Sequence, residues 1–127
     1  MAGGVTYDTG ALIAAEAGQR DFWALHATVL KRGVRPVVPA NVLAQAWRGG
    51  SQVQLSRLLR GCRIEELDEP LARAAGTALG LAGTTDVTDA VVVVGALRRN
   101  DLVVTSDIGD IIHLATVLGQ KLRTHAV

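Results

Sequence analysis

Aspartates occupy positions in this sequence where they could bind a metal ion. Asp8 follows an apolar run, Val5–Tyr7, and Asp107 comes shortly after another, Leu102–Thr105. Both runs are rich in residues that favour strands, and the carboxyl ends of parallel strands meet at one edge of a sheet. Carboxylates brought together there repel one another, and such oxygen ligands suit Mg²⁺ or Mn²⁺. The spacing therefore predicts a divalent-metal site at that edge.

Four further aspartates lie in the same part of the sequence as Asp107. Asp86 and Asp89 are one turn apart at the start of a predicted helix, and Asp110 is one turn after Asp107. Taken singly, Asp86, Asp107 and Asp110 are more often helix caps than ligands, at odds of about two to one. Asp89 lies inside the first turn beside an apolar run, which favours a role beyond capping. Asp101 is interpreted as a turn residue.

Other chemistries lack the residues that they need. The sequence has no phosphate-binding G-x-x-x-x-G-K-[ST] loop, no G-x-G-x-x-G after a strand and no G-x-S-x-G elbow. The histidines His26, His113 and His125 are far apart and are interpreted as surface or satisfied core residues. The one cysteine, Cys62, excludes an intrachain disulfide and is interpreted as a structural thiol.

The formal net charge of +1 conceals a segregation of charge along the chain. Residues 31–63 carry seven basic side chains and no acidic one, whereas the segments before and after carry net charges of −2 and −4. Such segregation indicates a polyanion or acidic partner for one segment and a cation for another. A metal site beside a basic segment favours phosphodiester chemistry. The low aromatic content, 3%, argues against a module that stacks successive bases on rings.

Short apolar runs alternate with helical stretches along the 127 residues. Strands are predicted at Val5–Tyr7, Pro36–Val38, Ile64–Leu67, Leu102–Thr105 and Leu122–Val127. Helices are predicted over Thr9–Ala17, Arg20–Lys31, Pro39–Arg48, a segment capped by Ser51 that ends at Arg60, Glu69–Leu81, Val87–Arg99 and Ile108–Leu118. This alternation predicts an α/β fold, a three-layer α/β/α domain over residues 1–127 with a parallel sheet of about four to five strands.

Two features of the sequence bear on the helix Val87–Arg99 and on the compartment. The four valines of residues 91–94 favour a strand, but the length of the segment and its polar ends favour a helix. The longest apolar runs have four or five residues, far short of a membrane span, and no signal peptide is recognised. We therefore expect a cytoplasmic protein.

The chain resembles the PIN-domain nucleases and, among them, the VapC-type toxins of bacterial toxin–antitoxin pairs. The similar segments, in order, are YDTGALIA around Asp8, VPANVLAQAWRGG over 38–50, DVTDAVVVVGAL over 86–97 and VVTSDIGDI over 103–111. This resemblance runs from end to end. It implies a PIN-like sheet flanked by helices, an endoribonuclease that depends on Mg²⁺ or Mn²⁺, a homodimer, and inhibition by a VapB-type antitoxin.

The resemblance also implies roles for individual residues. Asp8, Asp89 and Asp107 match the acids that bind the metal and act in catalysis, and Asp110 matches an additional catalytic acid. Accessory positions of the family match Asp86, Thr9 and Thr105.

Three arginines of the basic segment are candidates for contact with RNA or with acidic residues of an antitoxin. They are Arg48, Arg57 and Arg60. For each, a solvated helix face is an equally good interpretation.

Gln45 departs from the family pattern, which usually has a glutamate at this position. A glutamine offers a neutral oxygen without charge, so metal binding is expected to weaken. Either Asp86 or Asp110 compensates, or the chain is a degenerate PIN domain that binds RNA or antitoxin with weak or no cleavage. A phosphatase of the haloacid dehalogenase type, with Asp8 as nucleophile, is a weaker alternative because position 10 is Gly10 and not a second aspartate.

Overall fold

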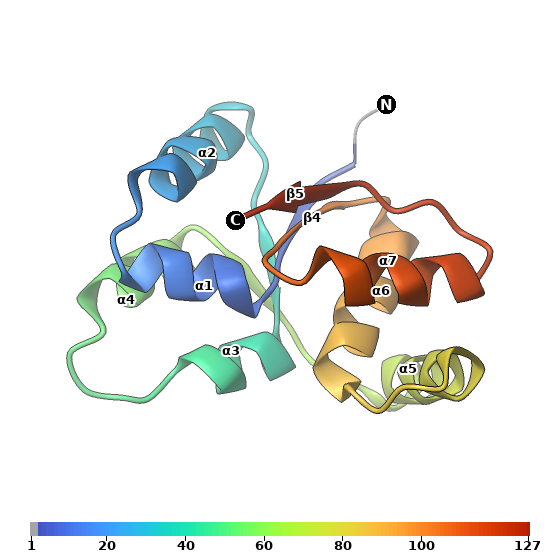
Figure 1. Cartoon of the computed structure of the whole chain (residues 1–127). Coiled ribbons are helices and arrows are strands. Elements are labelled where there is room, and N and C mark those ends of the chain that lie inside the picture. The colour runs from blue at the N-terminus through green and yellow to red at the C-terminus, as the bar shows by residue number, and fades with distance from the viewer. Residues whose placement is uncertain (1–2) are drawn as a thin grey trace.

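The computed structural model describes residues 3–127, and Figure 1 shows a sheet with helices on both sides. All strand pairs are parallel, in the order β3-β2-β1-β4-β5. The strands are β1 (Val5–Tyr7), β2 (Val37–Pro39), β3 (Arg63–Glu65), β4 (Leu102–Thr105) and β5 (Thr124–Ala126). The predicted α/β class and parallel sheet are confirmed.

Helices fill every connection between the strands. They are α1 (Thr9–Glu16), α2 (Arg20–Lys31), α3 (Ala40–Ala46), α4 (Val53–Arg60), α5 (Glu69–Ala82), α6 (Val87–Arg99) and α7 (Ile108–Val117). In Figure 1, α1 to α4 lie on one side of the sheet and α5 to α7 on the other. This arrangement follows from right-handed crossovers, since the chain first moves from β1 out to β3 and then returns past β1 to β4.

The order of strands reverses between β1 and β4. Asp8 directly follows β1, and the segment Ser106–Asp107 directly follows β4. Residue pairs Val5↔Leu102 and Tyr7↔Val104 fix the register of the two strands. In open α/β sheets, ligands bind in the crevice beyond the carboxyl ends of the strands at such a reversal. The fold therefore brings Asp8 and Asp107, which are 99 residues apart in the sequence, to the place where a site is expected.

The valine-rich segment forms α6, as predicted. The Asp86 side chain caps its start by accepting a hydrogen bond from the backbone N–H of Asp89, and Asn100 ends it in the left-handed conformation with φ of 58°. The helix is buried from Thr88 to Ala96 because it packs between the sheet, α5 and α7. Each buried valine contributes roughly 1.5–3 kcal/mol to the free energy of unfolding.

Several predicted boundaries were wrong by one or two residues, and two local predictions failed. β2 ends at Pro39 itself, so Pro39 precedes α3 and does not begin it. Ser51 does not cap α4, which starts at Val53 after a Gln52 whose side chain makes no capping bond. β3 begins at Arg63, one residue before the predicted strand, because its register pairs Arg63 with Val37.

His26 and Cys62 both lie in the core, which selects the core alternative for His26 and agrees with Cys62 as a structural thiol. His26 is buried, and the Tyr7 hydroxyl lies 2.8 Å from His26 Nδ1 in a hydrogen bond. Cys62 is buried as well, and burial raises the pKa of its thiol to about 12. Within residues 3–127, no single helix is both long and apolar enough to cross a bilayer; α5 and α6 pass such a test only as a pair bent by 111°.

Candidate functional site

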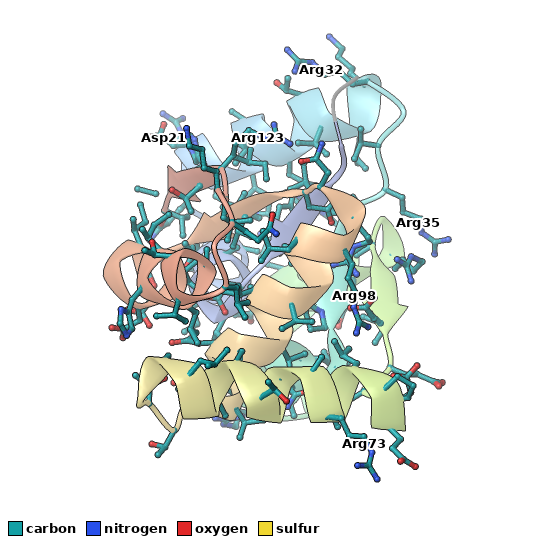
Figure 2. All side chains as sticks on the ribbon, turned by 90° about the vertical axis from the view of Figure 1, so that its right-hand side faces the viewer. Asp21, Arg32, Arg35, Arg73, Arg98 and Arg123 are labelled. Carbon is teal, nitrogen blue, oxygen red and sulfur yellow. The ribbon has the colours of Figure 1, made fainter. Side chains whose placement is uncertain are left out.

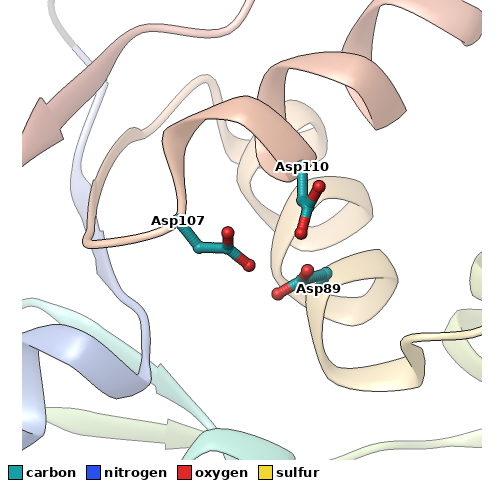
Figure 3. Close-up of side chains that lie close together, drawn as sticks. All are labelled: Asp89, Asp107 and Asp110. Carbon is teal, nitrogen blue, oxygen red and sulfur yellow. The ribbon is translucent and has the colours of Figure 1, made fainter.

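Asp89, Asp107 and Asp110 come together at the strand reversal. One carboxylate oxygen from each can be chosen so that all three oxygens lie within 4.8 Å of one another. Figure 3 shows the three side chains pointing toward a common centre, Asp89 from α6 and the other two from the start of α7. Carboxylate oxygens alone suit a hard divalent cation such as Mg²⁺ or Mn²⁺. The donor set therefore fits the predicted ion.

Crowding and burial make these carboxyl groups hard to ionise. Burial raises the pKa of Asp89 to about 8, with further contributions from the negative charges of Asp86, Asp8 and Asp107. The pKa of Asp107 is also raised, by desolvation and by its neighbour Asp110. Without a cation, the cluster therefore holds protons that exposed aspartates would have lost. A divalent ion removes this penalty by compensating the charge.

Asp8 lies in the same cleft and is held from two sides. Its Oδ1 accepts a 2.8 Å hydrogen bond from the backbone N–H of Thr9, and its Oδ2 accepts a 2.7 Å bond from the Thr105 hydroxyl. Only 4% of Asp8 is exposed. It lies outside the close trio of Asp89, Asp107 and Asp110, so the structure orients it without placing it in that cluster.

We call the hollow around these residues the acid cleft; its volume is about 270 Å³. It is lined by Asp8, Thr9, Gly10, Ile13, Gln45, Asp86, Asp89, Ser106 and Asp107. A second hollow of about 310 Å³ lies beside it and shares Asp86 and Asp89 with it. Asp110 lines this second hollow, so the carboxylate trio is reached from both.

Asp86, Asp107 and Asp110 could each be a helix cap or a metal ligand, and the structure shows one of them, Asp86, as a cap. Asp86 Oδ1 accepts a 3.0 Å hydrogen bond from the backbone N–H of Asp89, which makes it a helix cap that also lines the acid cleft. Asp107 precedes α7 but makes no capping bond with its side chain. Its carboxylate is instead directed to Asp89 and Asp110 (Figure 3).

Gly10 and Ser106 line the acid cleft but were not predicted to belong to the site. A Cβ atom on Gly10 would lie 2.3 Å from Ser106 Oγ, so a side chain there would displace the loop after β4. The signal in the sequence was the glycine in the first turn of a predicted helix, where it lowers helix propensity without a local benefit. Gly10 lets α1 approach the loop that carries Asp107.

Asp101 was interpreted as a turn residue, and this was incomplete. It is 3% exposed, and its carboxylate accepts hydrogen bonds from Gly4 N at 2.9 Å, Thr6 Oγ1 at 2.7 Å and Arg99 Nε at 2.8 Å. Arg99 also pairs with Glu65 of β3. Asp101 directly precedes β4 and so lies at the amino edge of the sheet, opposite the acid cleft; the network links it to β1, to α6 and, through Arg99, to the last residue of β3.

The basic segment does not form one surface around the acid cleft. Lys31, Arg32 and Arg35 precede β2, and Arg63 begins β3, so all four lie toward the amino ends of the strands. In Figure 2, Arg32 and Arg35 point outward into solvent.

The three candidate arginines belong to the connection between β2 and β3. Arg48 follows α3, where its guanidinium donates to the carbonyls of Ala44 and Trp47. Arg57 lies 4.0 Å from the centre of the Trp23 ring, and Arg60 ends α4. Of the three, Arg48 is nearest in the chain to a residue of the acid cleft, Gln45.

Comparison with known proteins identifies the fold through structure and not through sequence. No family model matches the chain, and no curated protein sequence matches it. Solved structures match over nearly the whole length, as described next.

Three solved structures illustrate this likeness. VapBC2 from Rickettsia felis, bound to a DNA fragment from its promoter, matches with a TM-score of 0.69 at 16% identity, over 97% of this chain and 98% of that one. FitAcB from Neisseria gonorrhoeae matches with 0.66 at 15% identity, over 94% and 95%. PAE2754 from Pyrobaculum aerophilum matches with 0.62 at 19% identity, over 94% and 100%. The chain has the PIN-like α/β/α fold of these proteins.

Proposed function

We propose that this protein is an endoribonuclease dependent on Mg²⁺ or Mn²⁺ that acts as the toxin of a type II toxin–antitoxin system. The observation that carries the proposal is the trio Asp89, Asp107 and Asp110, whose oxygens lie within 4.8 Å of one another at the strand reversal of a PIN-like fold. The substrate class follows from the chemistry, because a carboxylate-held divalent ion suits phosphodiester hydrolysis.

Each residue of the site has a separate task in this proposal. Asp89 and Asp107 hold the metal ion, with Asp110 on the side of the second hollow and Asp8 on the side of β1. A bound Mg²⁺ supplies polarisation of the phosphoryl group and activation of water. Thr105 and Thr9 fix the two oxygens of Asp8, and Asp86 holds the first turn of α6 so that Asp89 faces the cleft.

A cleavage assay tests the enzymatic part of the proposal. We expect wild-type protein to cleave single-stranded or structured RNA in Mg²⁺ or Mn²⁺, and Asp89→Asn to reduce the rate by at least about a hundredfold, as loss of a metal ligand does. Asp21→Asn is the matched control, because Asp21 is an exposed aspartate on α2 outside the acid cleft. Equal cleavage by all three proteins, or activity that survives EDTA, would contradict the assignment.

A protein partner completes the proposal, and we infer a VapB-type antitoxin. Two exposed apolar side chains come from α1 and α4: Ile13, which lines the acid cleft and is 58% exposed, and Val53, which begins α4 and is 68% exposed. A hollow of about 280 Å³ between α1 and α4 is lined by Ile13, Ala17 and Leu55 among others and joins the acid cleft through Ile13. Exposed apolar surface of this kind marks a protein contact.

Binding experiments test the partner. We expect the product of an adjacent small reading frame to bind this protein and inhibit cleavage, and Val53→Glu to weaken that binding while leaving RNA cleavage unchanged. If the antitoxin inhibits Val53→Glu as strongly as wild type, it binds a surface that does not include Val53.

We also propose that the chain acts as one domain and forms a homodimer in the cytoplasm. Light scattering of the purified protein tests the dimer.

A further inference from the structure

The amide of Gln45 is tied to the backbone segment that holds Asp8. Gln45 lies near the end of α3, is exposed, and lines the acid cleft. The Thr9 hydroxyl donates a 2.6 Å hydrogen bond to Gln45 Oε1, and the Thr9 backbone N–H donates to Asp8 Oδ1. The orientation of the Gln45 side chain is therefore set by Thr9.

This hydrogen bond fixes the orientation of the amide. Oε1, the atom that could ligate a cation, uses one of its two lone pairs to accept the Thr9 proton, and the bond turns Nε2 away from Thr9. No residue within 3–127 accepts a hydrogen bond from Nε2, which carries two N–H donors and has no affinity for a metal ion. Gln45 thus presents donors to its surroundings.

The two sides of the acid cleft differ in their charge. Asp89 and Asp107 come from the helical layer of α6 and α7, whereas Gln45 comes from α3 on the other side of the sheet. A phosphate that enters this cleft meets carboxylates from α6, from the residue before α7 and from the end of β1, and a neutral donor from α3. A glutamate at position 45 would add a negative charge and could only accept hydrogen bonds when ionised.

We propose that Gln45 donates a hydrogen bond from Nε2 to a non-bridging phosphate oxygen of the bound RNA strand, and that it is not a ligand of the metal ion. This inference rests on the proposed ribonuclease function and assigns a different task to a position where the resemblance suggests a weakened metal ligand. The aspartates alone then hold the metal, and Gln45 contributes to the binding and positioning of the substrate.

Two binding measurements separate these tasks. The first is the affinity for Mn²⁺ without RNA, by electron paramagnetic resonance; the second is the affinity for a labelled single-stranded RNA in EDTA, where no metal-dependent cleavage occurs. We expect Gln45→Ala to keep the Mn²⁺ affinity of wild type within about twofold and to weaken RNA binding about tenfold, as loss of a hydrogen bond to a charged group does. Gln45→Glu should weaken RNA binding at least as much and increase Mn²⁺ affinity.

Controls keep the outcome clear. Gln120→Ala alters a glutamine beyond the far end of α7, about 15 Å of helix from Asp107, and should change neither affinity. The thermal midpoint of each variant checks that the fold is intact.

Two results would overturn the role of Gln45. One is a loss of Mn²⁺ affinity in Gln45→Ala as large as that in Asp107→Asn, and the other is unchanged RNA affinity in Gln45→Ala. If wild type cleaves RNA and Gln45→Ala binds it equally well, only this inference fails. If wild type neither binds nor cleaves RNA, the proposed function fails with it.

Discussion

The hydroxyl of Thr105 donates a 2.7 Å hydrogen bond to Oδ2 of Asp8, a residue 97 positions earlier in the chain. The Thr105 hydroxyl oxygen in turn accepts a 2.9 Å hydrogen bond from the backbone N–H of Asp107. One buried hydroxyl therefore connects the acid that follows β1 with the acid that follows β4. The spacing between these two parts of the site depends on it.

Thr105→Val tests this connection, because valine has nearly the same shape as threonine and lacks the hydroxyl. We expect RNA cleavage to decrease about ten- to hundredfold, the usual effect of losing a group that orients a metal-binding residue. The free energy of unfolding should decrease by about 1–3 kcal/mol, because the Asp107 N–H and the Asp8 carboxylate lose a partner. Thr105→Ser keeps the hydroxyl and should retain most of the activity. Equal losses in both variants would mean that the methyl group matters and the hydrogen bonds do not.

The raised pKa of Asp89 predicts an unusual dependence of stability on pH. In the absence of metal, burial and neighbouring carboxylates raise the pKa of Asp89 from 3.8 to about 8. Between these values the folded state holds a proton that the unfolded state has lost, so the free energy of unfolding falls as the pH rises from about 4 to about 8. Above the folded pKa this contribution is lost and no further decrease follows from this group.

Asp89→Asn isolates the effect, since asparagine does not titrate. We expect this variant to be more stable than wild type at pH 8 in EDTA by about 2 kcal/mol, a value reduced for screening by water in the open cleft. The difference should disappear near pH 4. Thermal unfolding of both proteins between pH 4 and pH 8.5 measures it, and parallel curves would contradict the raised pKa.

Metal binding should remove the loss of stability that the crowded carboxylates of the acid cleft cause in the metal-free protein. At a Mg²⁺ concentration one hundred times the dissociation constant, a ligand that binds only the folded state adds about 2.7 kcal/mol to the free energy of unfolding. For a chain of this length that corresponds to an increase in the thermal midpoint of roughly 10 °C. Asp107→Asn should lose most of the increase, whereas Asp21→Asn should retain it. The increase should also be larger at pH 8 than at pH 6, because the metal competes with protons for the same oxygens.

Asp101→Asn should lower the free energy of unfolding, whereas Asp89→Asn should raise it. Its carboxylate is 3% exposed and is paired with Arg99, so Asp101→Asn leaves a partly buried cation with less compensation. We expect this variant to lose about 3 kcal/mol of stability, as breaking a buried ion pair does, across pH 6 to 8. Cleavage per folded molecule should remain unchanged, because the network lies at the far edge of the sheet. A stabilised Asp101→Asn would mean that repulsion from Glu65 exceeds the attraction of Arg99.

Patterns along the sequence predicted the elements well because most of them are marked locally. α6 was recognised from its polar ends despite four valines, and α5, also predicted, begins after Asp68, which caps it by accepting from the Leu71 N–H. The three-residue strands were placed less accurately, since pairing with a neighbouring strand decides their bounds. The PIN-like fold, suggested by four short segments, is confirmed by the structural comparisons.

The sequence predicted which residues belong to the site better than it predicted how those residues are arranged. Which aspartates share the carboxyl edge follows from strand order, but the choice of Asp110 as a close neighbour of Asp89 depends on how α6 and α7 pack. No local pattern could show that Asp101 is buried, because its partners Gly4 and Thr6 lie almost one hundred residues away. The hydrogen bond between Thr9 and Gln45 likewise depends on the approach of α3 to α1.

The joining of β1 and β4 has a consequence for the synthesis of this protein. Asp8 leaves the ribosome 99 residues before Asp107. A nascent chain that lacks β4 and the start of α7 also lacks Asp107 and Asp110, so the carboxylate cluster cannot form before these elements are made. The order of the elements along the chain thus delays the assembly of the acid cleft until α7 can pack against α6.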